Sequence, residues 1–463
     1  MTATLRASPS LEPRHPAPAR GWWRDACGLV VWLSVLSVVA LWVSGRGVQD
    51  LSTDPLTSLG RLTGLVSADL LLLQVLLMAR IPWAERAYGQ DELARRHRLV
   101  GSGSVTLVLA HITLISLGYA ATDHSGLLRE GWELLTTYPG MLLAGAGTVA
   151  LLVVAVTSVR AARRKLRYES WHLLHLYAYL GVGLALPHQL WTGADFTASP
   201  VATAFWWTAY ALAAGALLLW RVVVPVGRNL RHRLVVDRVV GEGAGVVSVY
   251  LRGRDLGRLP VAAGQFFVWR FLDGPGASRG HPFSLSVAPD GTGLRITAKD
   301  LGDGSARLAR LRPGTRALVE GPYGRLGSVR AGPKITLIAA GVGITPLRAL
   351  LEAMPYRHGE AVLLYRAGSA ADAVFSRELD AIAARRGVRL AYLHGPRPRD
   401  RVSWLPDRYG GAPDAHVMRH LVPDIAEHDV YVCGPAAWTA AVIAAARAAG
   451  VARGRLHTES FAW

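Results

Sequence analysis

The sequence predicts a multidomain membrane protein: a six-helix all-α transmembrane domain, then an antiparallel β-barrel, then a parallel-sheet α/β domain. Of the 463 residues, 51% are hydrophobic and only 18% are charged. The apolar residues concentrate before about residue 226, and most acidic residues follow that point. The expected parts are a tail (1–26), a helical domain (27–226), a barrel (232–328) and an α/β domain (333–463).

Six apolar stretches are long enough to cross a hydrocarbon core of about 30 Å as helices. A buried helix of a soluble protein could resemble any one of them, but six in series with polar breaks favour a membrane domain. A cleavable signal peptide is not expected, because the first twenty residues are rich in Pro and Arg. The predicted spans are residues 27–43, 59–78, 99–121, 141–159, 171–191 and 202–224.

The net charge of +18 is better explained by membrane orientation than by nucleic-acid binding. Arg residues cluster at the N-terminus and in segments 80–98, 160–167 and 228–233. The intervening loops carry Asp, Glu, Ser and Thr instead. Because short cytoplasmic loops are enriched in Lys and Arg, we expect a multi-pass protein of the cell membrane with both termini in the cytoplasm. No nucleic-acid partner is expected.

The residues after about 233 read as two soluble domains. Runs 235–240, 245–251 and 265–271, separated by Gly, Pro and Asp, predict strands of a small antiparallel barrel that ends near residue 321. Apolar strands and helices then alternate, which is typical of a parallel sheet. The expected strands are 335–339, 361–365, 388–393 and 430–433, and the expected helices are 346–353, 375–385 and 437–449.

Histidines inside the predicted spans are candidate functional residues, because ionisable residues at membrane depth are rare. His97 and His111 lie at the start and in the body of the third span, and His175 and His188 lie in the fifth. The two histidines on one helix are thirteen or fourteen residues apart, which corresponds to about 20 Å along the helix at 1.5 Å per residue. Because both helices run in the same direction, His97 would face His175 and His111 would face His188. Imidazole is an axial ligand of haem iron, so the four residues predict two stacked haems. The alternative is polar contact between helices; His172 is expected to be structural or a reserve ligand.

The angle around the helix axis between the two histidines of one helix is compatible with a shared face in the third span but less so in the fifth. His97 and His111 differ by about 320° and can share a face, whereas His175 and His188 differ by about 220°. Pro187 directly precedes His188, so a kink or local unwinding there is expected to close the difference.

With these features the chain resembles the ferric reductase and NADPH oxidase superfamily over nearly all of residues 28–463. Its members have a six-helix domain with two histidine pairs on the third and fifth helices, and a ferredoxin-reductase-like module follows. The resemblance implies two b-type haems in single file across the membrane, supplied with electrons by FAD from the cytosol.

Residues 281–286, His-Pro-Phe-Ser-Leu-Ser, are similar to the flavin-binding signature of this superfamily. A donor, a rigid Pro and two hydroxyls at a strand end suit a flavin ring and its pyrophosphate. Residues 299–305 resemble the second pyrophosphate loop, where small residues let backbone N–H groups approach phosphates. The FAD-binding residues implied are His281, Pro282, Phe283, Ser284, Ser286, Lys299, Gly302, Gly304 and Ser305.

A glycine-rich turn marks the expected nucleotide site. Residues 341–346, Gly-Val-Gly-Ile-Thr-Pro, follow a predicted strand and open a predicted helix. The glycines permit a tight turn, and the helix N-terminus offers N–H groups to a pyrophosphate. The candidate residues are Gly341, Gly343, Ile344, Thr345 and Pro346.

Further candidates follow other strand ends or lie at the C-terminus. Arg366 suits the 2′-phosphate of NADPH, where an acidic residue would select NADH; a solvated surface Arg is the alternative, and NADH stays possible. Cys433, Gly434 and Pro435 match the nicotinamide-side motif of the superfamily, which places Cys433 near the nicotinamide. By spacing alone, a buried strand-end thiol fits Cys433 equally well. Trp463 resembles the aromatic residue that covers the flavin ring in relatives.

These features predict an NAD(P)H-dependent oxidoreductase that passes electrons through FAD and two haems to an extracytoplasmic acceptor. Ferric chelate and molecular oxygen, which would give superoxide, are both open as acceptors. The alternative is a protein of a different functional class, a module that relays electrons to a partner protein and does not itself reduce a small molecule.

Overall fold

The computed structural model describes residues 22–163, 165–166, 168–243, 245–274, 276–277, 279–300, 302–327 and 332–459. The chain falls into two compact units, which meet in sequence between Val222 and Val223. The first is all-helical and is called the helical unit; the second contains every described strand and is called the sheet unit. The boundary lies four residues before the one that hydropathy predicts.

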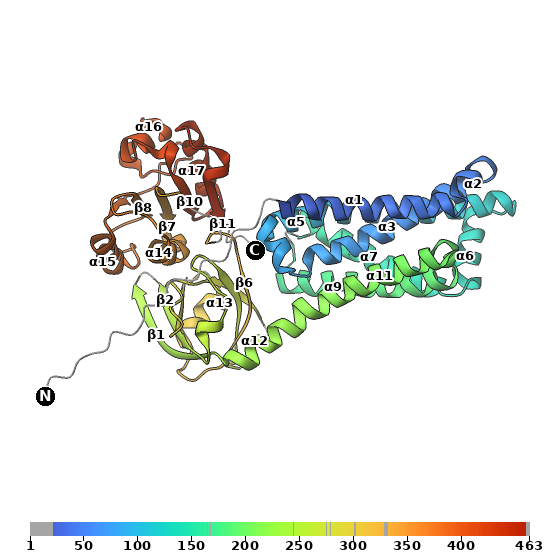
Figure 1. Cartoon of the computed structure of the whole chain (residues 1–463), viewed down its shortest axis with the longest axis horizontal. Coiled ribbons are helices and arrows are strands. Elements are labelled where there is room, and N and C mark those ends of the chain that lie inside the picture. The colour runs from blue at the N-terminus through green and yellow to red at the C-terminus, as the bar shows by residue number, and fades with distance from the viewer. Residues whose placement is uncertain are drawn as a thin grey trace. The chain divides into compact units, whose positions relative to one another are not determined.

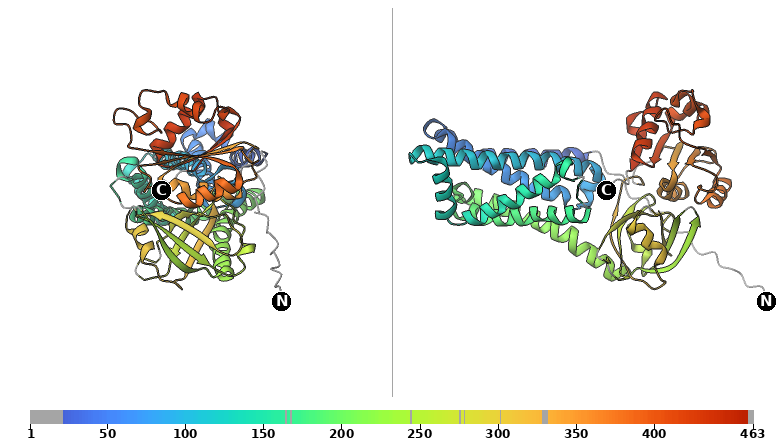
Figure 2. Two further views of the ribbon diagram at one scale, coloured as in Figure 1. Left: turned by 90° about the vertical axis from the view of Figure 1, so that its left-hand side faces the viewer. Right: turned by 180° about the vertical axis from the view of Figure 1, so that it is seen from behind.

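The long helices of the helical unit run side by side as a bundle (Figures 1 and 2). Among the described residues, five helices are long and apolar enough to cross a membrane. They are α1 (Trp22–Ser44), α3 (Pro55–Met78), α5 (Gln90–Thr122), α7 (Met141–Ser158) and a continuous helix, Pro200–His232, composed of α11 (Pro200–Leu218), the π-helical turn Leu219–Val223 and α12 (Val224–His232).

The fifth predicted span coincides with α9 (Tyr168–Trp191), which is not one of these five helices. It carries His172, His175, His188 and Gln189 within 24 residues, and these polar side chains lower its mean hydropathy. Short helices lie between the long ones: α2 (Gly47–Thr53), α4 (Pro82–Tyr88), α6 (Leu127–Thr137), α8 (Arg160–Arg163) and α10 (Ala194–Thr197).

Helix packing in this unit uses small residues. α3 packs closely against α1 and α5, and α7 packs closely against α9. A Cβ atom on Gly147 of α7 would lie 2.7 Å from the carbonyl oxygen of Gly181 on α9, so only glycine allows this approach. Many apolar side chains on the outside of the bundle are exposed, such as Trp32 at 68%. An exposed apolar surface of this kind suits contact with lipid.

Helix α1 begins at Trp22, five residues before the start that hydropathy predicts. Aromatic and polar contacts explain the extension. The rings of Trp22 and Trp23 stack with centroids 4.2 Å apart. The hydroxyl of Tyr88 donates a hydrogen bond to the carbonyl of Arg24 at 2.7 Å. These contacts stabilise the first turn of α1, and a hydropathy profile does not take such contacts into account.

The first half of the sheet unit holds two antiparallel three-stranded sheets, with strand orders β1-β2-β5 and β4-β3-β6. Isolated bridges join their edges at both sides: Val235 pairs with Arg316, and Leu285 pairs with Ile296. The short helix α13 (Asp303–Ala306) follows β5. The strands are β1 (Val235–Gly243), β2 (Val246–Arg252), β3 (Phe266–Phe271), β4 (His281–Ser284), β5 (Leu294–Lys299) and β6 (Ala317–Tyr323).

Helix α12 is joined to β6 by the side chains of Arg228, which donates to the carbonyl of Gly321, and Asn229. The amide of Asn229 donates to the carbonyl of Val319 at 2.9 Å and accepts from the N–H of Val319 at 2.8 Å. Because Val319 lies on β6, this pair of bonds continues the sheet's hydrogen bonding onto the end of the helix.

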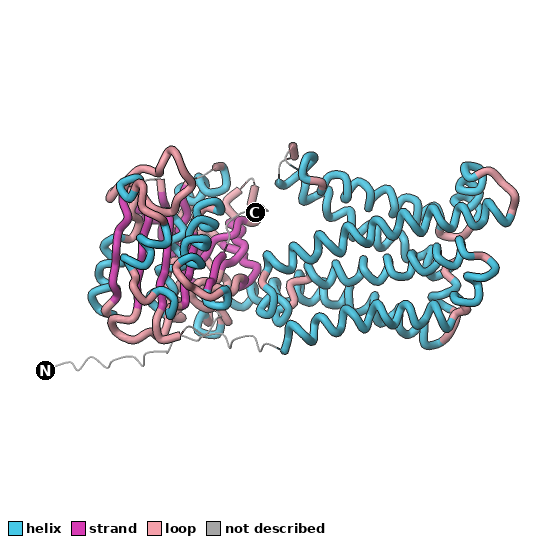
Figure 3. The backbone as a smooth tube through the Cα atoms, turned by 90° about the horizontal axis from the view of Figure 1, so that it is seen from above, coloured by secondary structure: helices cyan, strands magenta, loops and turns pink. Residues whose placement is uncertain are grey.

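The second half of the sheet unit is a five-stranded parallel sheet in the order β11-β10-β7-β8-β9. Figure 3 shows the described strands of the sheet unit in magenta. Its strands are β7 (Ile335–Ala340), β8 (Ala361–Ala367), β9 (Val388–His394), β10 (Asp429–Cys433) and β11 (Leu456–Glu459). Helices α14 (Ile344–Ala353), α15 (Ser376–Arg386), α16 (Asp414–Leu421) and α17 (Ala436–Ala448) complete it.

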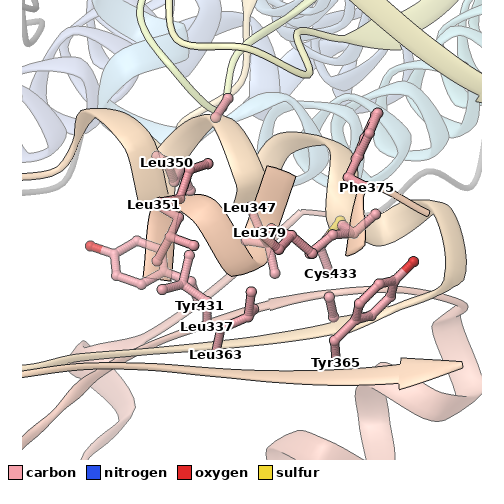
Figure 4. Packing of buried hydrophobic residues seen from close by; sticks show 14 of the residues in the cluster. Leu337, Leu347, Leu350, Leu351, Leu363, Tyr365, Phe375, Leu379, Tyr431 and Cys433 are labelled. Atoms are coloured by element: carbon pink, nitrogen blue, oxygen red, sulfur yellow. The ribbon is translucent and has the colours of Figure 1, made fainter. Parts of the chain in front are cut away.

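Both faces of this sheet are buried, because successive side chains of a strand point to opposite sides. Leu337 of β7 joins the cluster formed with α14 and α15, where Leu347 and Leu379 are fully buried (Figure 4). Its neighbour Ile338 joins the other cluster, with Val442 of α17. A strand that is buried on both faces is apolar at nearly every position, as β7 and β8 are. The predicted strands and helices of this half are confirmed, and β11 and α16 are additions that were not predicted from the sequence.

Candidate functional site

The four predicted histidines form two facing pairs in the helical unit. The ring centroids of His97 on α5 and His175 on α9 lie 5.8 Å apart. Those of His111 on α5 and His188 on α9 lie 6.5 Å apart. Imidazole nitrogens bind a metal ion at about 2 Å, so two rings on opposite sides of one ion have centroids roughly 6 Å apart. Both pairs therefore have the spacing of two axial ligands.

Each of these imidazoles uses Nδ1 for a hydrogen bond within the protein. Nδ1 of His97 donates to the carbonyl of Gln74 at 3.3 Å, and Nδ1 of His111 donates to the carbonyl of Gly60 at 2.8 Å. A carbonyl can only accept, so both rings carry their proton on Nδ1 and present the lone pair of Nε2. A bond of this kind fixes the tautomer and orientation of a metal-binding histidine.

The two rings on α9 have hydroxyl partners instead. Nδ1 of His175 lies 3.2 Å from Oγ of Ser158, and Nδ1 of His188 lies 2.6 Å from Oγ1 of Thr192. The Thr192 hydroxyl is also 2.8 Å from the backbone carbonyl of His188, to which it can donate. Its oxygen is then available to accept from Nδ1, which again leaves Nε2 for a ligand.

The ligand set fits a haem better than a metal ion bound by protein alone. No group of three or more His, Cys, Asp or Glu side chains suited to a metal ion occurs in the described part of the chain. Two imidazoles per site thus need further ligands from outside the protein, and a porphyrin supplies four nitrogens. In their described residues, α5 and α9 also contact each other far less extensively than α3 and α5 do.

A glycine pair on α3, which the sequence reading overlooked, lets His111 take its place. Gly60 and Gly64 are spaced as in the Gly-x-x-x-Gly pattern of close helix contacts. A Cβ atom on Gly64 would lie 2.6 Å from Nδ1 of His111. The pattern signals close approach of a neighbouring helix, but it cannot reveal that an imidazole occupies the space.

Both His175 and His188 face a histidine of α5, although α9 has no break at Pro187. Pro187 lies inside α9, and the helix continues without a break from Tyr168 to Trp191. His188 nevertheless faces His111, as the ring distance of 6.5 Å requires. His172 lies on the same helix, three residues before His175.

In the sheet unit, the residues of the flavin signature form strand β4 and the turn after it. The hydroxyl of Ser284 is buried and has no hydrogen-bond partner among the described residues. The residue itself is 4% exposed. A buried hydroxyl without a partner is unfavourable, and it points to a ligand group that completes it. His281, Pro282 and Phe283 are partly exposed on the same strand.

Ser286, by contrast, is engaged inside the protein. It is fully buried, and its hydroxyl lies 2.8 Å from Oγ1 of Thr297 and accepts from Nε of Arg295 at 3.0 Å. Its carbonyl accepts from Arg295 at 2.9 Å and from Arg348 at 3.0 Å. Of the two predicted hydroxyls, Ser284 is therefore the one available to a ligand.

The predicted pyrophosphate loop lies between β5 and the helix after it. Lys299 ends β5 and is exposed, as is Gly302. The hydroxyl of Ser305 donates to the carbonyl of Gly302 at 3.0 Å and so tightens the turn. Gly304 lies within α13.

The glycine-rich turn lies between β7 and α14, as predicted, but the helix begins at Ile344, two residues earlier than expected. The turn touches the end of the neighbouring strand β10, since a Cβ atom on Gly343 would lie 2.1 Å from the carbonyl oxygen of Cys433. The hydroxyl of Thr345 donates to the carbonyl of Val342 at 2.9 Å. No side chain caps the N-terminus of α14, although the N–H of Ile344 donates to the carbonyls of Gly341 and Val342 in the preceding turn. Pro346 is buried in the first turn of this helix, as its fixed φ allows.

The motif at the end of β10 lies against the last described strand. Cys433 is fully buried, and its sulfur lies 3.9 Å from the carbonyl of Glu459. Burial, and then the nearby Glu459 carboxylate, raises the pKa of the Cys433 thiol well above its ordinary value, so it stays protonated at neutral pH. A Cβ atom on Gly324 would lie 2.4 Å from the carboxylate of Glu459. Gly434 and Pro435 continue from Cys433 to α17.

Arg366 is buried, unlike an arginine that binds a phosphate group at the protein surface. It is only 7% exposed, and its guanidinium donates to the carbonyls of Leu393 at 3.2 Å, Gly395 at 2.7 Å and Pro396 at 3.0 Å. It also donates to the carbonyl of Ala367. These bonds join the ends of β8 and β9.

The sequence reading also missed a charged network inside the sheet unit. Arg295 of β5 donates to both carboxylate oxygens of Glu378 on α15, at 2.8 and 3.0 Å. Arg348 of α14 donates to the same carboxylate at 2.6 Å. Burial opposes ionisation of Glu378, but its bonds and proximity to both arginines outweigh burial and lower its pKa. The network ties the antiparallel sheets to the helices of the parallel sheet. Trp463 lies outside the described residues.

The fold and these sites define a class: a membrane-embedded helical unit followed by a two-part nucleotide-binding oxidoreductase module. Residues 63–186 match the family described as "Ferric reductase like transmembrane component", and residues 337–443 match "Oxidoreductase NAD-binding domain". The chain belongs to the ferric reductase-like transmembrane family, with the NAD-binding domain fused to it. The predicted fused architecture is thereby confirmed.

Known proteins resemble the chain in parts. It is 33% identical over 198 residues to "Protein-methionine-sulfoxide reductase heme-binding subunit MsrQ" of Klebsiella pneumoniae subsp. pneumoniae, covering 42% of this chain and 91% of that protein. It is 34% identical over 201 residues to "Ferredoxin--NADP reductase B" of Sorangium cellulosum, covering 40% of this chain and 80% of that protein. The flavohaem-like FAD/NAD-binding domain of nitric oxide dioxygenase from Vibrio cholerae aligns with a TM-score of 0.41 and 26% identity, over 50% of this chain and 98% of that one.

Proposed function

We propose that this protein is a transmembrane oxidoreductase that passes electrons from cytosolic NAD(P)H, through FAD and two b-type haems, to an acceptor on the other side of the membrane. The observation that carries the proposal is the two facing histidine pairs, in which the Nδ1 atoms are hydrogen-bonded and the Nε2 atoms remain available to bind a ligand. The relative from Klebsiella is itself named as a haem-binding subunit.

His97 with His175, and His111 with His188, would each hold one haem. Haem supplies single-electron transfer, and flavin converts a hydride into single electrons. The residues of α5 set the two sites fourteen positions apart, or about 21 Å along the helix. Two sites at this spacing let an electron cross most of a hydrocarbon core that is about 30 Å thick. The sixth crossing, by α9, and cytoplasmic termini are parts of the same proposal, supported by the arginine-rich segments.

The FAD site is proposed at the antiparallel half of the sheet unit, residues 232–328. The two sheets there are bridged at both edges, which supports the barrel expected for a flavin domain. The unpartnered hydroxyl of Ser284 would bind the flavin, with His281 and the loop from Lys299 to Ser305 beside it. The remaining residues proposed to bind FAD are Pro282, Phe283, Gly302 and Gly304, whereas Ser286, whose hydroxyl is engaged within the protein, would only support the site.

NAD(P)H is proposed to bind residues 333–463. The uncapped start of α14 and the glycine turn before it, Gly341 to Pro346, suit the pyrophosphate. Arg366 is buried in backbone bonds, and burial followed by the nearby Arg397 and Arg408 lowers its pKa. Both neighbours are exposed, so we assign the 2′-phosphate of NADPH to them and a supporting role to Arg366. Cys433, with Gly434 and Pro435, would lie at the nicotinamide end, and Trp463 would cover the flavin.

The acceptor can be identified with sealed vesicles in which the purified chain is oriented and NADPH is enclosed on the side of the sheet unit. We expect reduction of an external ferric chelate, or oxygen uptake with superoxide formation. A second candidate, relay to a partner protein, is favoured by the relative's name as one subunit of a larger reductase. It predicts slow turnover with both small acceptors and fast oxidation of the haems on addition of the partner. A preparation without a b-type haem spectrum, or whose flavin is not bleached by NADPH, would contradict the whole proposal.

Ser284→Ala is expected to weaken FAD binding about tenfold without destabilising the flavin-free protein. The hydroxyl has no partner to lose in the described structure, so removing it costs only the bond to the ligand. FAD affinity by fluorescence titration and thermal unfolding of the apoprotein check both parts. Ser286→Ala is the matched control: it breaks the bonds to Arg295 and Thr297 and should lower stability. Unchanged FAD affinity in Ser284→Ala would refute the assignment.

A further inference from the structure

Asp69 is a buried carboxyl group in the middle of α3, and the proposed electron path does not use it. The residue is 1% exposed. Its Oδ1 accepts a hydrogen bond from the hydroxyl of Ser34 on α1 at 2.5 Å. Its Oδ2 is buried and has no hydrogen-bond partner among the described residues. A permanent charge with one hydrogen bond is costly inside a membrane, and acidic residues so placed commonly exchange protons.

Asp69 lies at a level between the two histidine pairs. On the same helix, Gly64 contacts the ring of His111, and the carbonyl of Gln74 accepts from His97. Asp69 is five residues from each of these contacts, or about 7.5 Å along the helix axis. It is therefore close to both proposed haem levels and is itself no metal ligand.

No charged side chain of the described residues forms an ion pair with Asp69. On its own helix, Arg61 is engaged with Asp50 and Asp195. On α11, the hydroxyl of Tyr210 donates to Gln189. The titratable and charged groups of the elements packed against α3 are Arg24, Asp25 and Cys27 on α1; Asp50 on α2; Asp91, Glu92, Arg95, Arg96, His97, Arg98, His111 and Tyr119 on α5; and Tyr210 on α11.

We propose that Asp69 is a proton-binding site that balances the charge of an electron held in the helical unit, an inference that rests on the proposed haem function. A ferric haem with two imidazoles carries one net positive charge, which a ferrous haem lacks. The oxidised unit therefore supports an ionised Asp69. When one electron enters, the carboxylate takes one proton from water; when the electron leaves, the proton is released. Charge in the helical unit is conserved, because one electron and one proton enter together; the carboxyl O–H bond forms as one O–H bond of a solvent hydronium ion or water breaks, and the reverse happens on release.

The size of the coupling follows from Coulomb's law. Two unit charges about 10 Å apart at an effective dielectric constant of about 20 change a binding equilibrium roughly tenfold. Such a coupling makes the haem midpoint potential depend on pH. The limiting slope is about 59 mV per pH unit for one proton and one electron.

Redox titration of the haem-loaded full chain in lipid nanodiscs, over a range of pH, tests the proposal. We expect the midpoint potential to fall as pH rises in the wild type and to stay flat in Asp69→Asn. The matched control is Asp123→Asn, which changes an exposed carboxylate in the same way and should keep the wild-type slope. Retention of the wild-type slope in Asp69→Asn would overturn the proposal.

Infrared difference spectra between reduced and oxidised protein provide a readout that does not depend on turnover. Reduction should produce the C=O stretch of a protonated carboxyl group, and this band should be missing in Asp69→Asn. Ser34→Ala covers the case in which Asp69→Asn does not fold: it keeps the carboxyl, so the band should persist at a shifted frequency. An unshifted band in Ser34→Ala would contradict the assignment. A haem-loaded wild type with a pH-independent potential overturns the Asp69 proposal alone, whereas a chain without a haem spectrum overturns the proposed function as well.

Discussion

Replacing His111 with Leu is expected to lower the haem content from about two to about one per chain, because one axial imidazole is lost from one site only. Transfer to the outer acceptor should fall by at least about 100-fold, since the remaining haem cannot span the membrane. Reduction of the flavin by NADPH should be unchanged, because its residues lie in the sheet unit. Pyridine haemochrome quantitation and stopped-flow flavin absorbance measure the two effects separately.

His124→Leu is the matched control for this variant. His124 is exposed after the end of α5 and faces none of the histidine pairs, so the same substitution there should leave both haems in place. Retention of two haems in His111→Leu would show that the ligand assignment is wrong. Loss of both haems in His111→Leu, with the chain still folded, would show that the two sites are not independent.

Glu378→Gln is expected to lower the free energy of unfolding of the sheet unit by about 2–3 kcal/mol, because two buried guanidinium groups lose their common counter-charge. The side chains of Arg295 and Arg348 are 4% and 8% exposed, so water reaches these two guanidinium groups poorly, although 36% of the Glu378 side chain is exposed and Arg348 keeps Glu352 as a second partner. The midpoint of thermal unfolding, followed by FAD fluorescence in the full chain, should fall by roughly 4–12 °C.

Glu427→Gln provides the control, since Glu427 is 66% exposed and pairs with Lys334 at the surface. Its loss should cost less than about 1 kcal/mol. The contribution of Glu378 should also depend on pH. Because the folded pKa lies below the unfolded one, the stabilisation is complete above about pH 4.3 and is lost as pH falls through the folded value. Equal effects of the two substitutions would contradict a role for the buried network.

Periodicity and composition predicted most of the elements, because the forces that form them are local. The long apolar runs became helices, and the strands of the parallel sheet lie within about two residues of their predicted ends. Predictions were weaker where a polar pattern interrupts an apolar one. Helix α9 lacks the hydropathy of its neighbours, since the histidines that we propose as haem ligands are also polar. Strand β11 was missed because four residues show too little alternation to be recognised.

Some residues of the candidate sites could likewise be selected from the sequence, and others could not. Motif and depth were enough to select the four histidines and the turn at Gly343, because residue type at a given spacing limits the chemistry. They could not select Ser284 over Ser286, since the difference depends on Arg295, which is distant in sequence. Nor could they show that Arg366 is enclosed by carbonyl groups.

By itself the sequence determined that this chain has a membrane-embedded helical part and a nucleotide-binding part, because hydropathy and strand–helix alternation act over short stretches. The tertiary structure decided which nitrogen of each of the four paired histidines is hydrogen-bonded, which serine hydroxyl has no partner among the described residues, and that Asp69 lies buried between the two histidine levels. These properties depend on contacts between residues far apart in the chain. Such contacts leave no periodic trace in the sequence.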